Sequence, residues 1–104
     1  MKNYACHRLY ISPSVYIKMA TLTIDEIGQV RKYDTLQTEN PFTEWIGGII
    51  FLSNGLEIIR RNTLRELLEE NMQPTASPVY AWHISHYDFT NEQLTPQSII
   101  QRLI

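Results

Sequence analysis

Alternation of apolar and polar residues runs through the chain and predicts a sheet. In residues 4–12, Leu9 and Ile11 lie on one side of a period-two pattern, which ends at Ser12-Pro13-Ser14. Residues 15–24 are rich in Val, Ile, Thr, Tyr and Met, and both alternating faces are substantially apolar. We expect two strands here, with the second covered on both sides.

A turn and a more polar strand follow. Asp25-Glu26-Ile27-Gly28 matches a bulged hairpin turn in which Gly28 adopts the left-handed conformation. Residues 29–36 are polar on both alternating sides, which is typical of an edge strand or a solvent-facing surface. Residues 37–41 are expected to be a loop, because Asn40 precedes Pro41 and is biased away from helix.

The longest apolar run, residues 43–55, predicts a buried central strand. Gly47-Gly48 and the turn signal Asn54-Gly55 bracket its densest part. The paired glycines indicate a bulge or a close approach of two backbones. They do not form a phosphate loop, because no Lys-Ser/Thr follows them and a strand comes next instead of a helix.

Two interpretations stay open for residues 56–61. Asn54-Gly55 followed by Ile58-Ile59 favours a hairpin and a further strand. The apolar spacing between Leu56 and Met72 also fits a helix that begins directly after the turn. Of the two, we prefer the hairpin.

Two helices are predicted in the second half of the chain. Thr63-Leu64-Arg65-Glu66 is a capping box, Leu64, Leu67 and Leu68 form the apolar face behind it, and Asn71 can close the helix. After a loop at residues 73–78, Thr95-Pro96 predicts the start of a short terminal helix that docks on the domain. Its apolar face would comprise Ile99, Ile100, Leu103 and Ile104.

Residues 79–89 predict a last long strand. Its alternation would place Tyr80, Trp82, Ile84 and His86 on one face and Val79, Ala81, His83, Ser85 and Tyr87 on the other. Together these elements predict an α+β fold, with a mainly antiparallel sheet of about five or six strands arranged as a sandwich or a half-barrel. A central helix and a short C-terminal helix complete it.

Composition limits the function classes. A chain of 104 residues with 43% hydrophobic and 19% charged residues fits one globular domain, residues 1–104, without a membrane span. The net charge of −2 gives no basic excess for binding nucleic acid. The single cysteine cannot form an internal disulfide, and no signal peptide precedes the first strand, so we expect a cytoplasmic protein.

Few residues could carry chemistry. His83 and His86 are three apart in a predicted strand, so their side chains diverge, as do those of the adjacent Cys6 and His7. With Asp88 they would nominally supply a nucleophile, a base and a carboxylate, yet no local motif supports that set. We therefore predict no catalytic residue, no metal ligand and no cofactor site.

Aromatic residues are plentiful for a domain of this size. The chain has six Tyr, three Phe and two Trp, too many large rings for the core of so small a domain to bury completely. Those on an outward strand face could form an interface or a ligand surface. The candidate residues for such a surface are Tyr80, Trp82, His83, His86, Tyr87 and Trp45.

Residues 23–30, 36–39 and 45–53 resemble the opening β-sandwich segment of metal-dependent amidohydrolases, and residues 88–103 resemble the part that closes this sandwich. Where that family continues with Pro-Gly and a His-x-His metal pair, this chain has Leu52-Ser53-Asn54-Gly55, and it has no room for a barrel. The resemblance therefore carries over no metal or catalytic residue. It implies a stand-alone module that associates with a larger enzyme.

Two functional hypotheses follow from the sequence. The first is a non-catalytic interaction module that forms a homodimer or binds a protein partner, and that binds neither nucleic acid nor membrane. The alternative is an enzyme that binds a small molecule or a metal around His83, His86 and Asp88.

Overall fold

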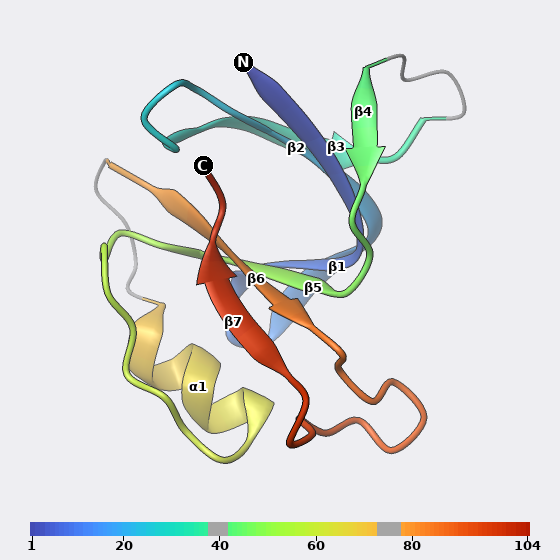
Figure 1. Ribbon diagram of the computed structural model, residues 1–104, viewed down its shortest axis with the longest axis vertical. Coiled ribbons are helices and arrows are strands. Elements are labelled where there is room, and N and C mark those ends of the chain that lie inside the picture. Colours follow the sequence, from blue (N-terminus) through green and yellow to red (C-terminus); the bar gives the residue numbers. More distant parts are fainter. Residues whose placement is uncertain (38–41, 73–77) are drawn as a thin grey trace.

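Strands dominate the computed structural model, which describes residues 1–37, 42–72 and 78–104 (Figure 1). Within these residues the chain forms seven strands and one helix. In chain order they are β1 (Lys2–Ser12), β2 (Val15–Ile24), β3 (Val30–Thr35), β4 (Thr43–Trp45), β5 (Ile49–Ser53), α1 (Leu64–Asn71), β6 (Tyr80–Ser85) and β7 (Ile99–Arg102).

The strands form one open mixed sheet in the order β3-β2-β1-β5-β6-β7, and β4 pairs with β1 beside this path. The chain returns after β3 to run alongside β1 in the same direction, so the β1–β4 and β1–β5 pairs are parallel. The other pairs are antiparallel. The expected sheet-dominated fold is therefore confirmed, and four of these strand pairs are antiparallel. The two parallel pairs make the sheet mixed, which the sequence did not predict.

Strand β5 is the buried centre of the sheet, as its apolar run predicts. All five of its residues are buried. Ile49 and Phe51 face a core under α1, whereas Ile50 and Leu52 face a second core on the other side. A strand covered on both faces needs apolar side chains at successive positions, which explains the unbroken run.

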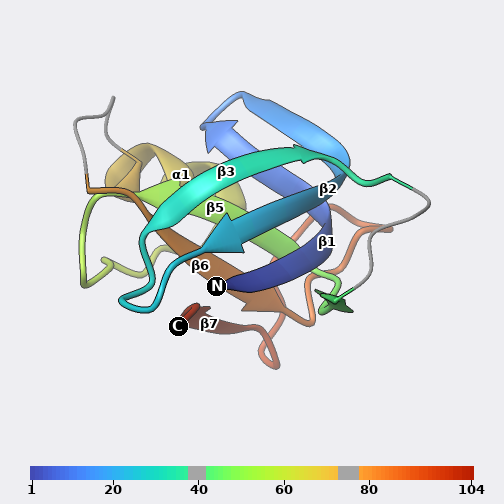
Figure 2. The ribbon, with the colours of Figure 1, turned by 90° about the horizontal axis from the view of Figure 1, so that it is seen from above.

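The two cores lie on opposite faces of the curved sheet. In the first, the helix side chains Leu64, Leu67 and Leu68 pack on residues of β1, β5 and β6. Figure 1 shows α1 beside these strands. The second lies where β1, β2 and β3 curl over β5 and β6 (Figure 2). At the start of β3, Gln29 forms a bridge with Tyr80, which ties the curl to the opposite part of the sheet.

Several local predictions are confirmed. Gly28 has a φ of 87° in the turn that joins β2 to β3, and β3 is an edge strand. The capping box also forms, since Thr63 Oγ1 accepts a hydrogen bond from the Glu66 N–H at 3.2 Å. Most of each loop expected, at residues 73–78 and at residues 37–41, falls outside the described residues, since these omit 73–77 and 38–41.

Residues 56–61 form neither the predicted strand nor the alternative helix, because α1 begins only at Leu64. A type I′ hairpin needs positive φ at both turn residues, and neither Asn54 nor Gly55 has it. The buried amide of Asn71 instead takes the place of a neighbouring strand. It accepts from the Ile59 N–H and donates to the Ile59 carbonyl, both at 2.7 Å.

The predicted C-terminal helix is wrong, because residues 99–102 form strand β7 along β6. Thr95 and Pro96 lie in a turn closed by the Ser98 N–H donating to Thr95 O at 3.0 Å. A helix of so few residues is costly to nucleate, whereas the edge of β6 offers ladder bonds to the β-branched Ile99 and Ile100. The terminus is docked as expected, since Leu103 is buried.

The last long strand is shorter than predicted, since β6 ends at Ser85. His86 has a φ of 56° and turns the chain out of the sheet. The Thr95 and Ser98 hydroxyls hold this corner by donating to the His86 carbonyl at 3.0 and 3.1 Å. Residues beyond 85 therefore leave the predicted alternation, and Tyr87 joins Trp82 in the core under α1.

Candidate functional site

The structure disperses the polar residues of the enzyme hypothesis. His83 is buried, with Nε2 3.0 Å from Gly47 O. His86 is exposed, and its Nδ1 lies 3.3 Å from Ser85 Oγ. Asp88 accepts hydrogen bonds from the N–H groups of residues 90 and 91 within its own loop. Within the described residues, no group of three or more His, Cys, Asp or Glu side chains is placed to hold a metal ion.

The cysteine is a core residue. Cys6 is 1% exposed and packs in the second core with Leu9 and Ile50. Burial raises the pKa of its thiol to about 12, which disfavours the thiolate that a nucleophile or a metal ligand requires.

His7 and His83 hold the glycine pair that interrupts the predicted central strand. Gly47 and Gly48 have φ values of 64° and 66°, and they separate β4 from β5. The Gly48 N–H donates to His7 Nδ1 at 2.9 Å, and the His83 ring contacts the Gly47 carbonyl at 3.0 Å. A Cβ on Gly48 would overlap the Ile84 carbonyl oxygen. The expected close approach of backbones is confirmed at this position.

The register along β1 shifts by one residue at this glycine pair, because Ala5 pairs with Trp45 and Arg8 pairs with Ile49. The extra residue therefore lies among residues 46–48. The N–H groups of His7 and Arg8 both donate to Gly48 O, at 3.1 and 3.3 Å. The side-chain alternation of β1 is interrupted here, since Cys6 and Leu9 face the same core although they are three residues apart.

The aromatic candidates do not form one exposed surface. Trp82 and Tyr87 are each 8% exposed and pack under α1, and Tyr80 is partly buried. Trp45 is 49% exposed and makes an edge-to-face contact with the His7 ring at 4.9 Å between centroids.

Arg8 lies at the centre of a cluster that the sequence did not reveal. Its guanidinium makes two hydrogen bonds to the Glu92 carboxylate, at 2.7 and 2.8 Å. It also lies 5.0 Å from the ring centroids of both Tyr16 and Phe89. The hydrogen bonds to Glu92 raise the pKa of Arg8. This cluster ties the loop after β6 to the β1–β2 hairpin.

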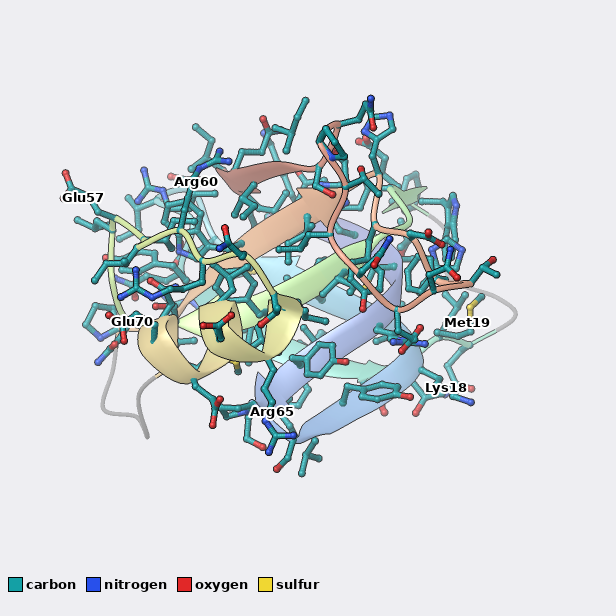
Figure 3. The ribbon with its side chains drawn as sticks, turned by 90° about the horizontal axis from the view of Figure 1, so that it is seen from below. Lys18, Met19, Glu57, Arg60, Arg65 and Glu70 are labelled. Carbon is teal, nitrogen blue, oxygen red and sulfur yellow. The ribbon has the colours of Figure 1, made fainter. Side chains whose placement is uncertain are left out.

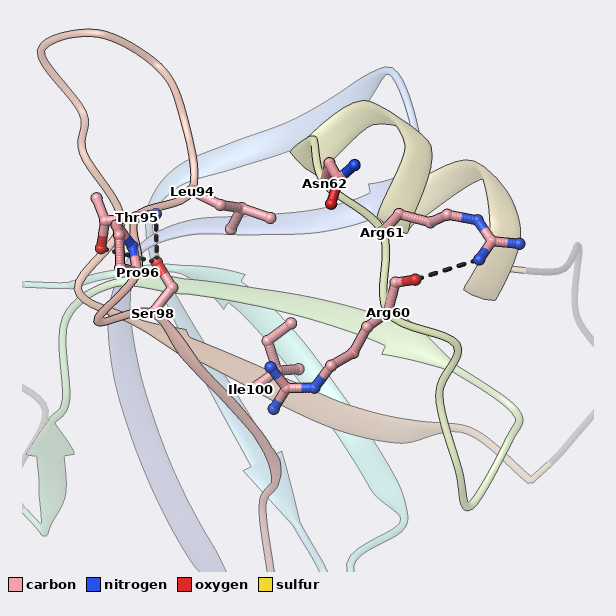
Figure 4. A pocket seen from close by; sticks show the side chains of 8 residues that line it. All are labelled: Arg60, Arg61, Asn62, Leu94, Thr95, Pro96, Ser98 and Ile100. Carbon is pink, nitrogen blue, oxygen red and sulfur yellow. Dashed lines mark hydrogen bonds between the residues drawn. The ribbon is translucent and has the colours of Figure 1, made fainter.

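Two surface clefts have mixed linings. The larger, about 880 Å³, lies between α1 and the β1–β2 hairpin and is lined by Tyr10, Pro13 and Glu92, among other residues. Arg65 also lines it and extends from α1 at the surface (Figure 3). The smaller, about 360 Å³, lies between residues 60–62 and residues 94–100 (Figure 4). There the Arg61 guanidinium donates to the Arg60 carbonyl at 3.2 Å.

The outer edge of β3 is largely unpaired within the described residues. Beyond the bridge at Gln29, no strand of the described residues pairs with this edge, and residues 31–35 are all exposed. The Leu36 N–H donates to Met19 O of β2 at 2.6 Å. Because N–H and C=O directions alternate along an antiparallel strand, those of Tyr33 and Thr35 point away from β2.

Side chains near Thr35 support this assignment. The Thr35 N–H donates to Asp34 Oδ1 at 2.7 Å, and the Thr35 carbonyl accepts from Gln37 Nε2 at 3.4 Å. Both Thr35 groups are thus bound by side chains of neighbouring residues instead of by β2. They face the free edge.

The two faces of β3 differ in character. Tyr33 pairs with Leu22 of β2 and lines an apolar groove of about 660 Å³ together with Ile11 and Leu52. Lys32 and Asp34, whose side chains alternate with that of Tyr33, line a polar hollow of about 290 Å³. Lys32 also borders the apolar groove, and Tyr33 also borders the polar hollow. An added strand would therefore meet an apolar and a charged surface at once.

Comparison with known proteins gives no match to any protein family, curated protein or solved structure. None of the helices in the described residues is both long enough and apolar enough to cross a membrane.

Proposed function

We propose that this chain is a non-catalytic interaction module that binds another protein chain by strand addition at the outer edge of β3. The single observation that carries the proposal is the set of outward-facing main-chain groups at Tyr33 and Thr35 in an exposed edge strand. An extended segment laid along this edge would continue the ladder of the sheet.

The side chains of β3 support recognition beyond the main chain. Tyr33 is 43% exposed and borders the apolar groove, so it can cover an apolar side chain of the added strand. Lys32 and Asp34 offer one charge of each sign on the other face. Main-chain bonds supply affinity in this binding mode, and alternating side chains supply specificity.

The proposal predicts that removing an outward-facing N–H blocks binding without breaking the sheet. Thr35→Pro removes such a group, and proline is tolerated at positions whose N–H faces away from the ladder. The matched control is Arg102→Pro in β7, at the opposite edge of the sheet. There the Leu103 N–H points inward and donates to Ala81 O, so the N–H of the preceding residue, Arg102, faces outward.

Association is measured by sedimentation velocity and by co-purification, and circular dichroism verifies folding. The proposal expects Thr35→Pro to abolish association and Arg102→Pro to preserve it. Association that survives Thr35→Pro in a folded protein would overturn the proposal.

A further inference from the structure

The charge pattern of β3 is complementary to itself. Lys32 and Asp34 flank Tyr33 with opposite charges. If two copies of β3 lie antiparallel with Tyr33 opposite Tyr33, each Lys32 lies opposite the Asp34 of the other copy. No charge in residues 32–34 then faces a like charge.

The hydrogen-bonding directions fit the same register. Tyr33 points its N–H and C=O outward, so two opposed Tyr33 residues can exchange both bonds. Thr35 has the same orientation, and this register places it opposite Arg31, where the β2–β3 register shifts by one residue. Lys32 and Asp34 then form the non-hydrogen-bonded pairs, in which cross-strand side chains lie closest, at about 4.5 Å between Cα atoms.

The two faces of the strand also agree with this arrangement. Both Tyr33 rings would lie on the side of the apolar groove, next to the second core. Both Lys32–Asp34 pairs would lie on the polar side, where charged side chains remain hydrated. Apolar groups are thus paired with apolar groups and charges with opposite charges.

From this complementarity we infer that the partner of β3 is a second copy of the chain. The two β3 strands pair antiparallel across a two-fold axis at Tyr33, and the two sheets join into one. This inference rests on the proposed strand addition at β3, and it adds the identity of the partner and the register. The interface is isologous, so each copy contributes the same residues.

One contact changes when the dimer forms. In the single chain the Asp34 carboxylate accepts from the Thr35 N–H at 2.7 Å. In the dimer the carboxylate turns from that N–H to Lys32 of the second copy. The competing contact limits the strength of the dimer, so we expect its dissociation to be measurable by dilution.

Charge reversal tests the register. Lys32→Asp places Asp opposite Asp34 twice, and Asp34→Lys places Lys opposite Lys32 twice. Each variant alone is expected to weaken the dimer by about tenfold or more. Mixing the two variants restores both opposite-charge pairs, so the mixture should form heterodimers with about the wild-type dissociation constant. The double variant in one chain should also recover the homodimer.

Sedimentation velocity over a concentration series separates the outcomes, with unfolding midpoints as the folding control. Weaker dimerisation of each single variant, together with wild-type dimerisation of their mixture, supports the inference. If the wild type dimerises, the charge-reversal variants dimerise equally well and Thr35→Pro does not dimerise, the register is overturned. The strand-addition proposal then still holds. A wild-type dimer that survives Thr35→Pro overturns both.

A monomeric wild-type chain at high concentration overturns the second-copy inference. The strand-addition proposal is then judged separately, by whether Thr35→Pro removes a partner that co-purifies with the wild type.

Discussion

The imidazole of His7 accepts a hydrogen bond from the Gly48 N–H, with 2.9 Å between Nδ1 and N. This bond joins β1 to the point where the chain turns from β4 into β5. A second hydrogen bond joins the same two residues, because the backbone N–H of His7 donates to the Gly48 carbonyl at 3.1 Å. The pair thus fixes the start of the central strand relative to the longest strand of the sheet.

Replacing His7 should weaken the fold through this bond. His7→Ala leaves the Gly48 N–H without its acceptor and removes the ring contact with Trp45, so we expect the free energy of unfolding to fall by about 1 kcal/mol. His7→Asn offers an amide oxygen near the position of Nδ1 and should recover part of the loss. Urea unfolding measures both. A His7→Ala protein with the same free energy of unfolding as the wild type would contradict the role of this bond.

Gly48 should not tolerate a side chain. Its φ of 66° is unfavourable for other residues, and an added Cβ would overlap the Ile84 carbonyl. Gly48→Ala should therefore lower the free energy of unfolding by about 2 kcal/mol or more. Gly55→Ala is the milder comparison and should lose less, because Gly55 lacks positive φ and an added Cβ would lie 3.0 Å from the Glu57 carbonyl oxygen without overlapping it. Equal losses in both variants would refute the argument.

His83 should make the stability of the protein depend on pH. Burial lowers its pKa below the ordinary value of 6.5, despite the opposing hydrogen bond to Gly47 O. Below pH 6.5 the unfolded state takes up a proton that the folded state resists, so stability falls as pH decreases from that value. His83→Gln keeps a donor for Gly47 but cannot titrate there.

The measurement is the free energy of unfolding between about pH 7.5 and about pH 5.5, where carboxylates stay ionised. The wild type should lose more stability over this range than His83→Gln. Parallel curves for the two proteins would show that His83 does not titrate differently on folding.

The thiol of Cys6 should be inert in the folded protein. Burial raises its pKa from 9.0 to about 12, which lowers the thiolate population at mildly alkaline pH roughly a thousandfold. A thiol reagent such as Ellman's reagent should react slowly with native protein and promptly after unfolding in urea. Fast reaction of the native protein would show that Cys6 is accessible.

Local patterns predicted the elements whose causes are local. The strand bounds at residues 15–24, the left-handed Gly28 and the Thr63 capping box depend on neighbouring residues, and each is present in the structure. The unbroken apolar run also identified the centre of the sheet. Its interruption at Gly48 was visible as a possible bulge, because a glycine pair in a strand has few other uses.

The errors arose where a distant residue supplies the decisive partner. Residues 56–61 follow neither pattern because Asn71 binds the backbone of Ile59. Residues 99–102 pair with β6 because the edge of β6 is open. The spacing of apolar residues cannot reveal which strand edges the fold leaves open. The Arg8–Glu92 contact spans 84 residues of sequence and carries no motif.

The predicted aromatic surface failed for the same reason, because the positions of its residues depend on more than the local pattern. Trp82 and Tyr87 were predicted on opposite faces of one long strand, yet both pack under α1 because His86 turns the chain. The polar edge at β3 was recognised from its composition. Which of its main-chain groups face outward became clear only from the bond between Leu36 and Met19.

Amide hydrogen exchange at Tyr33, followed as protein concentration rises, tests the central claim most directly. Its N–H faces outward at the free edge of β3, so pairing with a second copy should slow its exchange in proportion to the dimer population. The N–H of Leu36, bonded to Met19 within the same chain, serves as the internal control and should stay constant. Exchange at Tyr33 that is equally fast at every concentration would contradict pairing at this edge.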